Sequence, residues 1–253
     1  MDIDAYFKRL EIPKTEIRSL ELINQLIVAH KDKIPFENLE TYLYGRPADL
    51  DPDALFQKMI LHKRGGYCFE QNSLFALFLG KLGYEVFSCI CKLRSFEQII
   101  SHQGIIVHFM DEYYFCDVGY GGHSPSRAIL IREGEYVVDG YKCKISSCGN
   151  NWWSVQYDRN AVTVYVCLQP WEAVDFTPIN YFMTMNPGKF RDQLIVNRTM
   201  YNGYYSLHGD ELTEHIDGNT KKSIISRSDR ANILREKFNI VLNKESEKAL
   251  LAK

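Results

Sequence analysis

An excess of charge of one sign is what this sequence most clearly lacks. Its 30 lysines and arginines and its 32 aspartates and glutamates leave a formal net charge of −2 over 253 residues. Without a basic excess there is no broad positive field to gather phosphate groups or to hold the chain on an anionic lipid surface. We therefore expect neither a nucleic-acid partner nor a membrane partner.

Long hydrophobic runs are also missing. The longest uninterrupted apolar stretch extends only from Leu74 to Leu79, far short of the roughly 20 residues that a membrane-spanning helix needs. The opening segment MDIDAYFKRL contains two aspartates and lacks the apolar core of a secretory signal. We therefore expect a cytoplasmic protein.

The cysteines show neither a disulfide framework nor a zinc motif. They are odd in number and lie mostly within apolar, strand-like runs: Cys68, Cys89, Cys91, Cys116, Cys143, Cys148 and Cys167. This usage indicates reduced thiols. The spacings Cys89-x-Cys91 and Cys143-x4-Cys148 do not form the paired short motifs of a tetrahedral zinc site, so no metal is expected.

The first third of the chain has helical periodicity. Residues 16–30 carry apolar side chains at helical spacing, and Asp51 followed by proline is typical of an N-cap before a second helix. A third helix is predicted to begin at Tyr67 or Cys68 and to end at Leu82. It is apolar nearly all round, which predicts a buried position.

After Tyr84 the pattern changes to short β-rich segments divided by turn signals such as Asp111-Glu112 and Asp158-Arg159-Asn160. The predicted strands are 84–94, 104–110, 113–118, 128–131, 135–147, 151–157 and 161–169. This spacing indicates a small antiparallel barrel or sandwich.

The last part of the chain is mixed. It contains a predicted helix over 175–186, strands over 190–197 and 201–207, and a helix near 228–238. The predicted class is therefore α+β, with three parts: a helical part over 1–83, a β part over 84–186 and an α/β part over 187–253.

Cys68 is a candidate nucleophile because it follows two glycines and opens the predicted buried helix. The free N–H groups and partial positive charge of a helix N-terminus favour a thiolate. The alternative is a small buried hydrophobic side chain, the usual state of a cysteine in an apolar run.

A thiolate nucleophile needs a base, and two histidines precede the Asp111-Glu112 turn signal. If those two residues form a hairpin loop, Asp117 lies opposite Ile106 and shares a face with His102 and His108. That local geometry favours His108, a diagonal step from Asp117, whereas His102 needs a bulge or a wider turn. The pattern leaves both histidines as candidates.

Three stretches carry a family resemblance: IPFENL at 34–39, RGGYCFEQN at 64–72 and DVGYGG at 117–122. Together they resemble the arylamine N-acetyltransferases, and the similarity continues to LREKFNIVL at 234–242. By this resemblance Cys68 is the acetylated nucleophile, His102 the general base and Asp117 the carboxylate that orients the imidazole. The resemblance thus selects His102 over His108.

The resemblance also implies a fold and a reaction. The fold is an N-terminal helical bundle, a central antiparallel β-barrel and a C-terminal α/β lid around a core like that of cysteine proteases and transglutaminases. Acetyl-CoA is the implied co-substrate, and the acceptor is a small arylamine, hydrazine or N-hydroxyarylamine. Transfer through a Cys68 thioester implies ping-pong kinetics.

Further positions follow from the same resemblance. The backbone N–H groups of Cys68 and Ser101 are expected to form an oxyanion hole. Arg64 and Glu37 are expected to form a structural ion pair that fixes the turn before the nucleophile. The implied substrate-binding positions are Phe36, Tyr67, Tyr120 and Gly121.

Two other functions remain open from the sequence. A Cys-His-Asp hydrolase or amide synthase acting on a small acyl substrate uses the same order of residues. A catalytically silent scaffold that binds a ligand is the second alternative. An acyl adduct that persists on Cys68 separates the transferase from the hydrolase, and the rate at which iodoacetamide alkylates the thiol separates it from the scaffold, whose thiol should react no faster than free cysteine.

Overall fold

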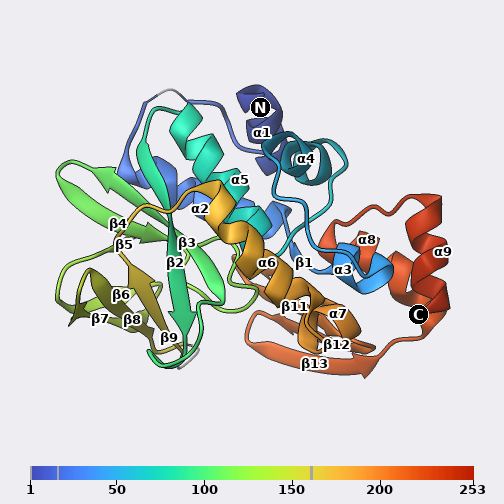
Figure 1. Ribbon diagram of the computed structural model, residues 1–253. Helices are drawn as coiled ribbons and strands as arrows, with labels where there is room; N and C mark the ends of the chain where they lie inside the picture. The colour runs from blue at the N-terminus through green and yellow to red at the C-terminus, as the bar shows by residue number, and fades with distance from the viewer. Residues whose placement is uncertain (1, 16, 160–161) are drawn as a thin grey trace.

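The computed structural model describes residues 2–15, 17–159 and 162–253 (Figure 1). Its helices are α1 (Ile3–Leu10), α2 (Leu20–Lys33), α3 (Leu39–Tyr44), α4 (Pro52–Phe56), the π-helical turn η1 (Gln57–Leu61), α5 (Cys68–Lys81), the short 3₁₀ helix η2 (Ala173–Asp175), α6 (Phe176–Met185), α7 (Lys189–Asp192), the 3₁₀ helix η3 (Arg227–Asp229), α8 (Arg230–Phe238) and α9 (Lys244–Ala252). Residue 16 of the first predicted helix, Asn160 of a predicted turn and residue 161 of a predicted strand lie outside the described residues.

The strands form two antiparallel sheets. They are β1 (Phe36–Glu37), β2 (Glu85–Leu93), β3 (His102–Phe109), β4 (Glu112–Cys116), β5 (Ile129–Leu130), β6 (Gly134–Val138), β7 (Tyr141–Gly149), β8 (Trp152–Tyr157), β9 (Val162–Cys167), β10 (Ile195–Met200), β11 (Gly203–His208), β12 (Glu211–Ile216) and β13 (Asn219–Ile224). The large sheet has the order β5-β4-β3-β2-β9-β8-β7-β6, and the small sheet has the order β1-β10-β11-β12-β13.

The helical part is built around α5. Asp51 caps α4 by accepting from the N–H groups of Asp53 and Ala54, with proline at the first helical position, as the sequence predicts. The α5 helix begins at Cys68, and its largest side chains, including Phe75 and Phe78, are fully buried. The predicted buried helix is therefore confirmed.

The large sheet is curled because its two edge strands are close in the chain. Only residues 131–133 separate β5 from β6, so the facing ends of these strands lie within roughly 15 Å. A flat sheet of eight strands would be roughly 34 Å wide. Among the described residues β5 and β6 do not pair with each other, so the predicted barrel is a curled, incompletely closed sheet.

Two predicted segments differ from the structure. The single strand expected over 135–147 is divided into β6 and β7 by a turn at Asp139 and Gly140, whose φ angles are 51° and 82°. Positive φ at both central residues is the geometry of a tight hairpin turn. The strand expected over 190–197 begins later, at Ile195, because α7 occupies the preceding residues.

The division of the chain into three parts, with boundaries near residues 83 and 186, stays a prediction. Residues 36–44 belong to the first predicted part but contact the third. Strand β1 pairs with β10, and Leu39 of α3 belongs to the same core cluster as Leu194 and as Phe238 of α8. In Figure 1, α6 runs from the side of the large sheet towards the small sheet, and α8 and α9 lie farthest from the large sheet. The core cluster that holds Cys68 draws side chains from all three predicted parts, among them Ile90 and Ile195.

Candidate active site

The chain that delivers Cys68 to the site passes so close to β1 that only glycine fits. A Cβ atom on Gly65 would lie 2.0 Å from the Pro35 carbonyl oxygen and 2.8 Å from Glu37 Cγ on β1, whereas one on Gly66 would lie 2.9 Å from the Glu70 Cβ atom on α5. In addition, the Glu37 N–H donates to the Gly66 carbonyl at 2.9 Å. The two glycines therefore allow the backbone to bond to β1 directly before α5 begins.

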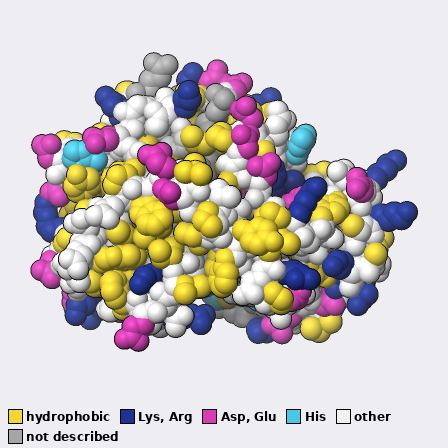
Figure 2. Space-filling view, in the orientation of Figure 1, with side chains coloured by type: hydrophobic (Ala, Val, Ile, Leu, Met, Phe, Trp, Pro, Cys, Tyr) yellow, Lys and Arg dark blue, Asp and Glu magenta, His cyan; other side chains and the backbone are white. Residues whose placement is uncertain are grey.

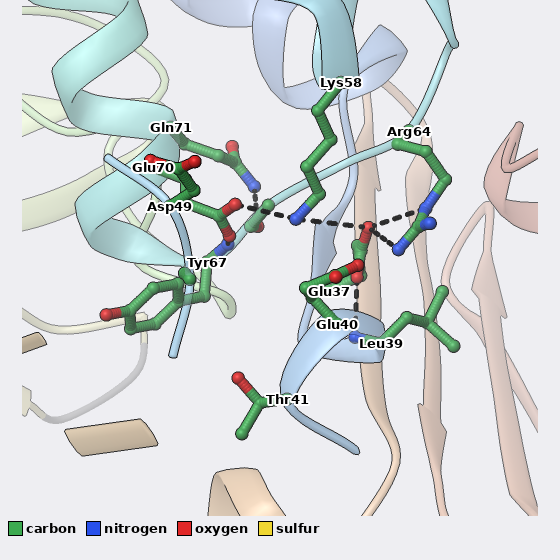
Figure 3. A network of polar contacts seen from close by, with 12 residues as sticks. Glu37, Leu39, Glu40, Thr41, Asp49, Lys58, Arg64, Tyr67, Glu70 and Gln71 are labelled. Carbon is green, nitrogen blue, oxygen red and sulfur yellow. Dashed lines mark hydrogen bonds and ion pairs between the residues drawn. The ribbon is translucent and has the colours of Figure 1, made fainter. Parts of the chain in front are cut away.

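A buried group of alternating charges fixes this turn (Figure 3). Arg64 Nη2 lies 2.8 Å from Glu37 Oε1, which confirms the predicted ion pair. Lys58 Nζ lies 2.7 Å from Glu70 Oε1 and 3.8 Å from the Glu37 carboxylate. Figure 3 shows both cations pointing at Glu37. Since Glu70 also accepts the Tyr67 N–H at 3.0 Å, this group ties the N-terminus of α5 to the first helices.

The two carboxylates of this group respond differently to burial. Burial raises the pKa of Glu37, but Arg64 and Lys58 outweigh it, so this pKa is lowered overall. Burial also raises the pKa of Glu70, and there Lys58 does not overcome it. The charge of Glu37 is therefore the better compensated, and Arg64 is its main partner.

His102 and Asp117 are joined by a direct side-chain contact in the interior. The Nε2 atom of His102 lies 2.7 Å from Asp117 Oδ2, and both side chains are buried. The other oxygen, Oδ1, accepts from Asn72 Nδ2 at 3.0 Å and from the Gly119 N–H at 2.9 Å. The carboxylate is thus held at both oxygens and fixes one edge of the imidazole ring.

The hairpin between β3 and β4 corrects the geometric preference for His108. The turn residues are Met110 and Asp111, with φ angles of 52° and 60°, whereas Asp111-Glu112 was predicted. Continuing the observed register by one step places Asp117 opposite position 104 and a diagonal step from His102. His108 instead bonds to the Glu85 carboxylate at 2.7 Å.

The electrostatics of this pair favour a protonated imidazole. Burial lowers the pKa of His102, but the charge and hydrogen bond of Asp117, with a hydrogen bond to Cys68, raise it well above its usual value. Burial raises the pKa of Asp117, but His102 and Asn72 lower it overall. The sulfur, the imidazole and the carboxylate therefore form one buried chain of neighbouring groups, in which His102 Nε2 and Asp117 Oδ2 are 2.7 Å apart.

A cavity of about 420 Å³ opens above this chain and is lined by Cys68 and His102. Among the expected substrate-binding positions, Phe36, Tyr120 and Gly121 also line it. Gly121 has a φ of +76°, and a Cβ atom there would lie 2.7 Å from the Phe36 ring. The Gly121 backbone can therefore approach Phe36 only without a side chain.

Two sequence-derived assignments do not fit this geometry. Tyr67 does not line the cavity: its ring is buried against Phe69 and Phe190, and its hydroxyl donates to Asn180. It packs against Phe190, which lines the cavity, and its contact with a substrate stays a prediction. The Ser101 N–H donates to the Cys91 carbonyl at 3.2 Å, so it is not a free oxyanion donor. Cys68 is the first residue of α5, where backbone N–H groups have no intrahelical acceptor.

Sequence reasoning gave no role to Asn72, although it lies within RGGYCFEQN. It is one helical turn after Cys68, and this spacing was the available signal. Its Nδ2 donates to Asp117 and to the Gln103 carbonyl, and its Oδ1 accepts the Val118 N–H at 3.0 Å. This one amide connects α5 to β3 and to the segment that follows β4.

Two features are absent from residues 2–15, 17–159 and 162–253. No three or more His, Cys, Asp or Glu side chains gather there in a way that could hold a metal ion. No helix in the same ranges is both long and apolar enough to cross a membrane.

The architecture places the chain in a known structural class. It superposes on the arylamine N-acetyltransferase of M. smegmatis with a TM-score of 0.89 and 25% identity, covering 100% of this chain and 98% of that one. The N-acetyltransferase family model matches residues 19–247. The chain therefore belongs to the N-acetyltransferase family, and it is an acyltransferase.

Two relatives agree with this assignment. The arylamine N-acetyltransferase of Mycobacterium tuberculosis is 29% identical over 264 residues, covering 95% of this chain and 89% of that protein. A protein of Salmonella typhimurium, named arylamine N-acetyltransferase / N-hydroxyarylamine O-acetyltransferase, is 36% identical over 139 residues, covering 51% of this chain and 47% of that one. The resemblance to the arylamine N-acetyltransferases is confirmed.

Proposed function

We propose that this protein transfers an acetyl group from acetyl-CoA to small arylamines through a thioester on Cys68. The observation that carries the proposal is the buried chain from Cys68 through His102 to Asp117 beneath a cavity of about 420 Å³. Such a chain pairs a nucleophile with a proton carrier held in one orientation. Hydrazines and N-hydroxyarylamines are further proposed acceptors, and the name of the Salmonella relative supports the second class.

In the first half-reaction the Cys68 thiolate attacks the thioester carbonyl carbon of acetyl-CoA. The carbon–sulfur bond to CoA breaks, and the departing thiolate takes the proton from the His102 imidazolium. Acetyl-Cys68, free CoA and a neutral imidazole result. One thioester replaces another, so this step has little thermodynamic cost.

In the second half-reaction the neutral amine attacks acetyl-Cys68, and its proton passes to His102. The bond from the acetyl carbon to Cys68 Sγ breaks, which releases the amide and restores the thiolate–imidazolium pair. Asp117 stabilises the imidazolium formed in this step and holds the ring in position. The free N–H of Cys68 is a donor for the developing oxyanion, and Phe36, Tyr120 and Gly121 are proposed to contact the acceptor.

Mass spectrometry of the intact protein tests this proposal. After incubation with acetyl-CoA and no acceptor, we expect a gain of one acetyl group that maps to Cys68 and is released by an arylamine. Cys68→Ala should abolish the adduct, whereas Cys148→Ala, which removes an exposed free cysteine, should retain it. A hydrolase would lose the adduct to water without an amine, and a silent scaffold would form none.

The nucleophile also suits a reducing compartment. Seven free cysteines are present, and Cys68 must stay reduced to accept an acetyl group. We therefore propose a cytoplasmic location, which fractionation of the source cells would test.

A further inference from the structure

A second chamber of about 540 Å³ adjoins the Cys68 cavity. The two share five lining residues, so the same wall borders both: Leu93, Arg94, Ser101, Met183 and Phe190. The shared residues come from the end of β2, from the segment before β3 and from the region of α6 and α7. A ligand with its reacting atom at Cys68 can therefore extend past this shared wall into the outer chamber.

The outer chamber is walled largely by apolar side chains that remain partly open to solvent. Ile99 is 57% exposed and Phe182 is 49% exposed, and Pro187 lines the same chamber. Figure 2 shows hydrophobic side chains gathered over the middle of this face, where Figure 1 places α6. Such walls suit the flat apolar ring of an acceptor.

Arg94 is the one permanently charged side chain among the described residues that line either chamber, and no aspartate or glutamate lines them. No carboxylate of the described residues forms an ion pair with Arg94, unlike Arg64, whose guanidinium is paired with Glu37. An arginine that faces an apolar cavity without a carboxylate partner offers a free site for an anionic oxygen group.

The backbone fixes the place of this arginine. Arg94 has a φ of 74°, which is uncommon for a residue with a side chain, and its N–H donates to the Thr163 carbonyl at 2.8 Å. Its charge reaches the inner cavity: burial raises the pKa of Tyr120 to about 12, and Arg94 opposes this rise. The Tyr120 ring in turn lies edge-on to His102, with 6.0 Å between the ring centroids.

We propose that the acceptors this site selects are arylamines that carry an acidic group, with the amine at Cys68 and the carboxylate at Arg94. This inference rests on the proposed function and specifies its substrate class. The phosphates of CoA offer the same anionic chemistry, but the long pantetheine arm separates them from the thioester. A side chain that lines the same small cavity as the reactive sulfur is therefore placed to meet the acceptor.

The test compares 4-aminobenzoate with its neutral analogue 4-aminobenzamide as acceptors for the wild-type protein, Arg94→Gln and Arg94→Lys. Both variants have a side chain at the same positive φ, so backbone strain is matched. For Arg94→Gln we expect kcat/KM for 4-aminobenzoate to fall by about fivefold, the loss typical of a partly exposed ion pair, with little change for 4-aminobenzamide. Arg94→Lys should recover part of the loss because it restores the charge.

The outcomes separate this inference from the proposed function. An equal loss for both acceptors, a loss for neither, or a raised KM for acetyl-CoA with both acceptors overturns the role of Arg94. A wild-type protein that forms acetyl-Cys68 but does not acetylate 4-aminobenzoate also overturns it and leaves the proposed function standing. A protein that forms no acetyl-Cys68 overturns the proposed function itself.

Discussion

Asn72 Nδ2 donates a 3.0 Å hydrogen bond to Asp117 Oδ1 and so joins the helix that begins with Cys68 to the carboxylate that contacts His102. All four of these side chains are buried. Because the contact joins α5 to the residue after β4, the relative position of sulfur and imidazole depends on an amide whose hydrogen bonds go to Gln103, Asp117 and Val118.

Asn72→Ala is therefore expected to disturb both stability and acetylation. It removes the Asn72 partner of the Gln103 carbonyl and of the Val118 N–H, and one of the two donors to Asp117 Oδ1, which should cost about 1–3 kcal/mol of unfolding free energy. The rate of Cys68 acetylation should fall as well. Urea unfolding and single-turnover acetylation measure the two effects, and Gln25→Ala on the exposed side of α2 is the control. Unchanged acetylation in Asn72→Ala would show that the amide does not position the site.

The two strand histidines should behave very differently when each is replaced by glutamine. His102→Gln removes the proposed base, so acetylation of Cys68 should fall by on the order of a thousandfold or more. His108→Gln removes a partly exposed contact with Glu85, whose side chain is 75% exposed, and should change the rate little. Mass spectrometry of the acetyl adduct over time measures both rates. The reverse pattern would assign the base to His108.

The turn lies one residue earlier than the sequence pattern predicts, which moves the strand partner of Asp117 by two positions, from Ile106 to Gly104, and explains why the predicted geometry favours His108. Sequence patterns locate a turn from residues that tolerate positive φ, and Asp111 fitted that signal, but Met110 rather than Glu112 is its partner in the turn. The shift preserves which side chains share a face while moving Asp117 along the strand. The sequence pattern therefore predicts that Asp117 shares one face of the hairpin with both histidines. The family resemblance is needed to choose His102 over His108.

The small sheet shows where the sequence signal is too weak. The pair β12 and β13 was not predicted, although Asp217 and Gly218 between them form a turn with φ angles of 50° and 79°. Most side chains of β13 are exposed, so its apolar–polar alternation is faint. In contrast, most side chains of α5 are apolar and buried, and its bounds were predicted to within one residue. An element whose side chains are buried leaves a clear apolar pattern in the sequence, whereas an exposed strand such as β13 does not.

A matched pair of glycines tests how tightly the loop after Asp117 packs on the nucleophile. A Cβ atom on Gly119 would lie 2.7 Å from Cys68 Cα and 3.0 Å from its carbonyl oxygen, whereas one on Gly122 would meet only the Tyr120 ring at 3.4 Å. Gly119→Ala should therefore lower stability by about 1–3 kcal/mol and displace Cys68 from His102. Gly122→Ala should change both little. Thermal unfolding and adduct formation compare them, and equal behaviour of the two variants would refute this close packing.

A buried histidine outside the site makes stability depend on pH. His30 on α2 is fully buried, and its Nδ1 lies 2.6 Å from the Tyr6 hydroxyl. Burial, together with the charge of Arg9, lowers its pKa to about 3, and the Gln71 side chain opposes the shift only partly. The folded protein therefore keeps this imidazole neutral well below the pH at which an unfolded chain protonates it.

The sign of the effect follows from proton counting. Between about pH 3 and the unfolded pKa of about 6.5, the unfolded chain binds more protons than the folded one, so stability rises with pH and is lost as the pH falls through this window. The slope from this one group is about 1.4 kcal/mol per pH unit. Urea unfolding at pH 7.5, 5.5 and 4.5 should show it for the wild type and for Tyr6→Phe, which keeps the histidine but loses its partner. His30→Gln should be less stable at pH 7.5 yet lose less on acidification, and an acid slope equal to that of the wild type would exclude His30 as its source.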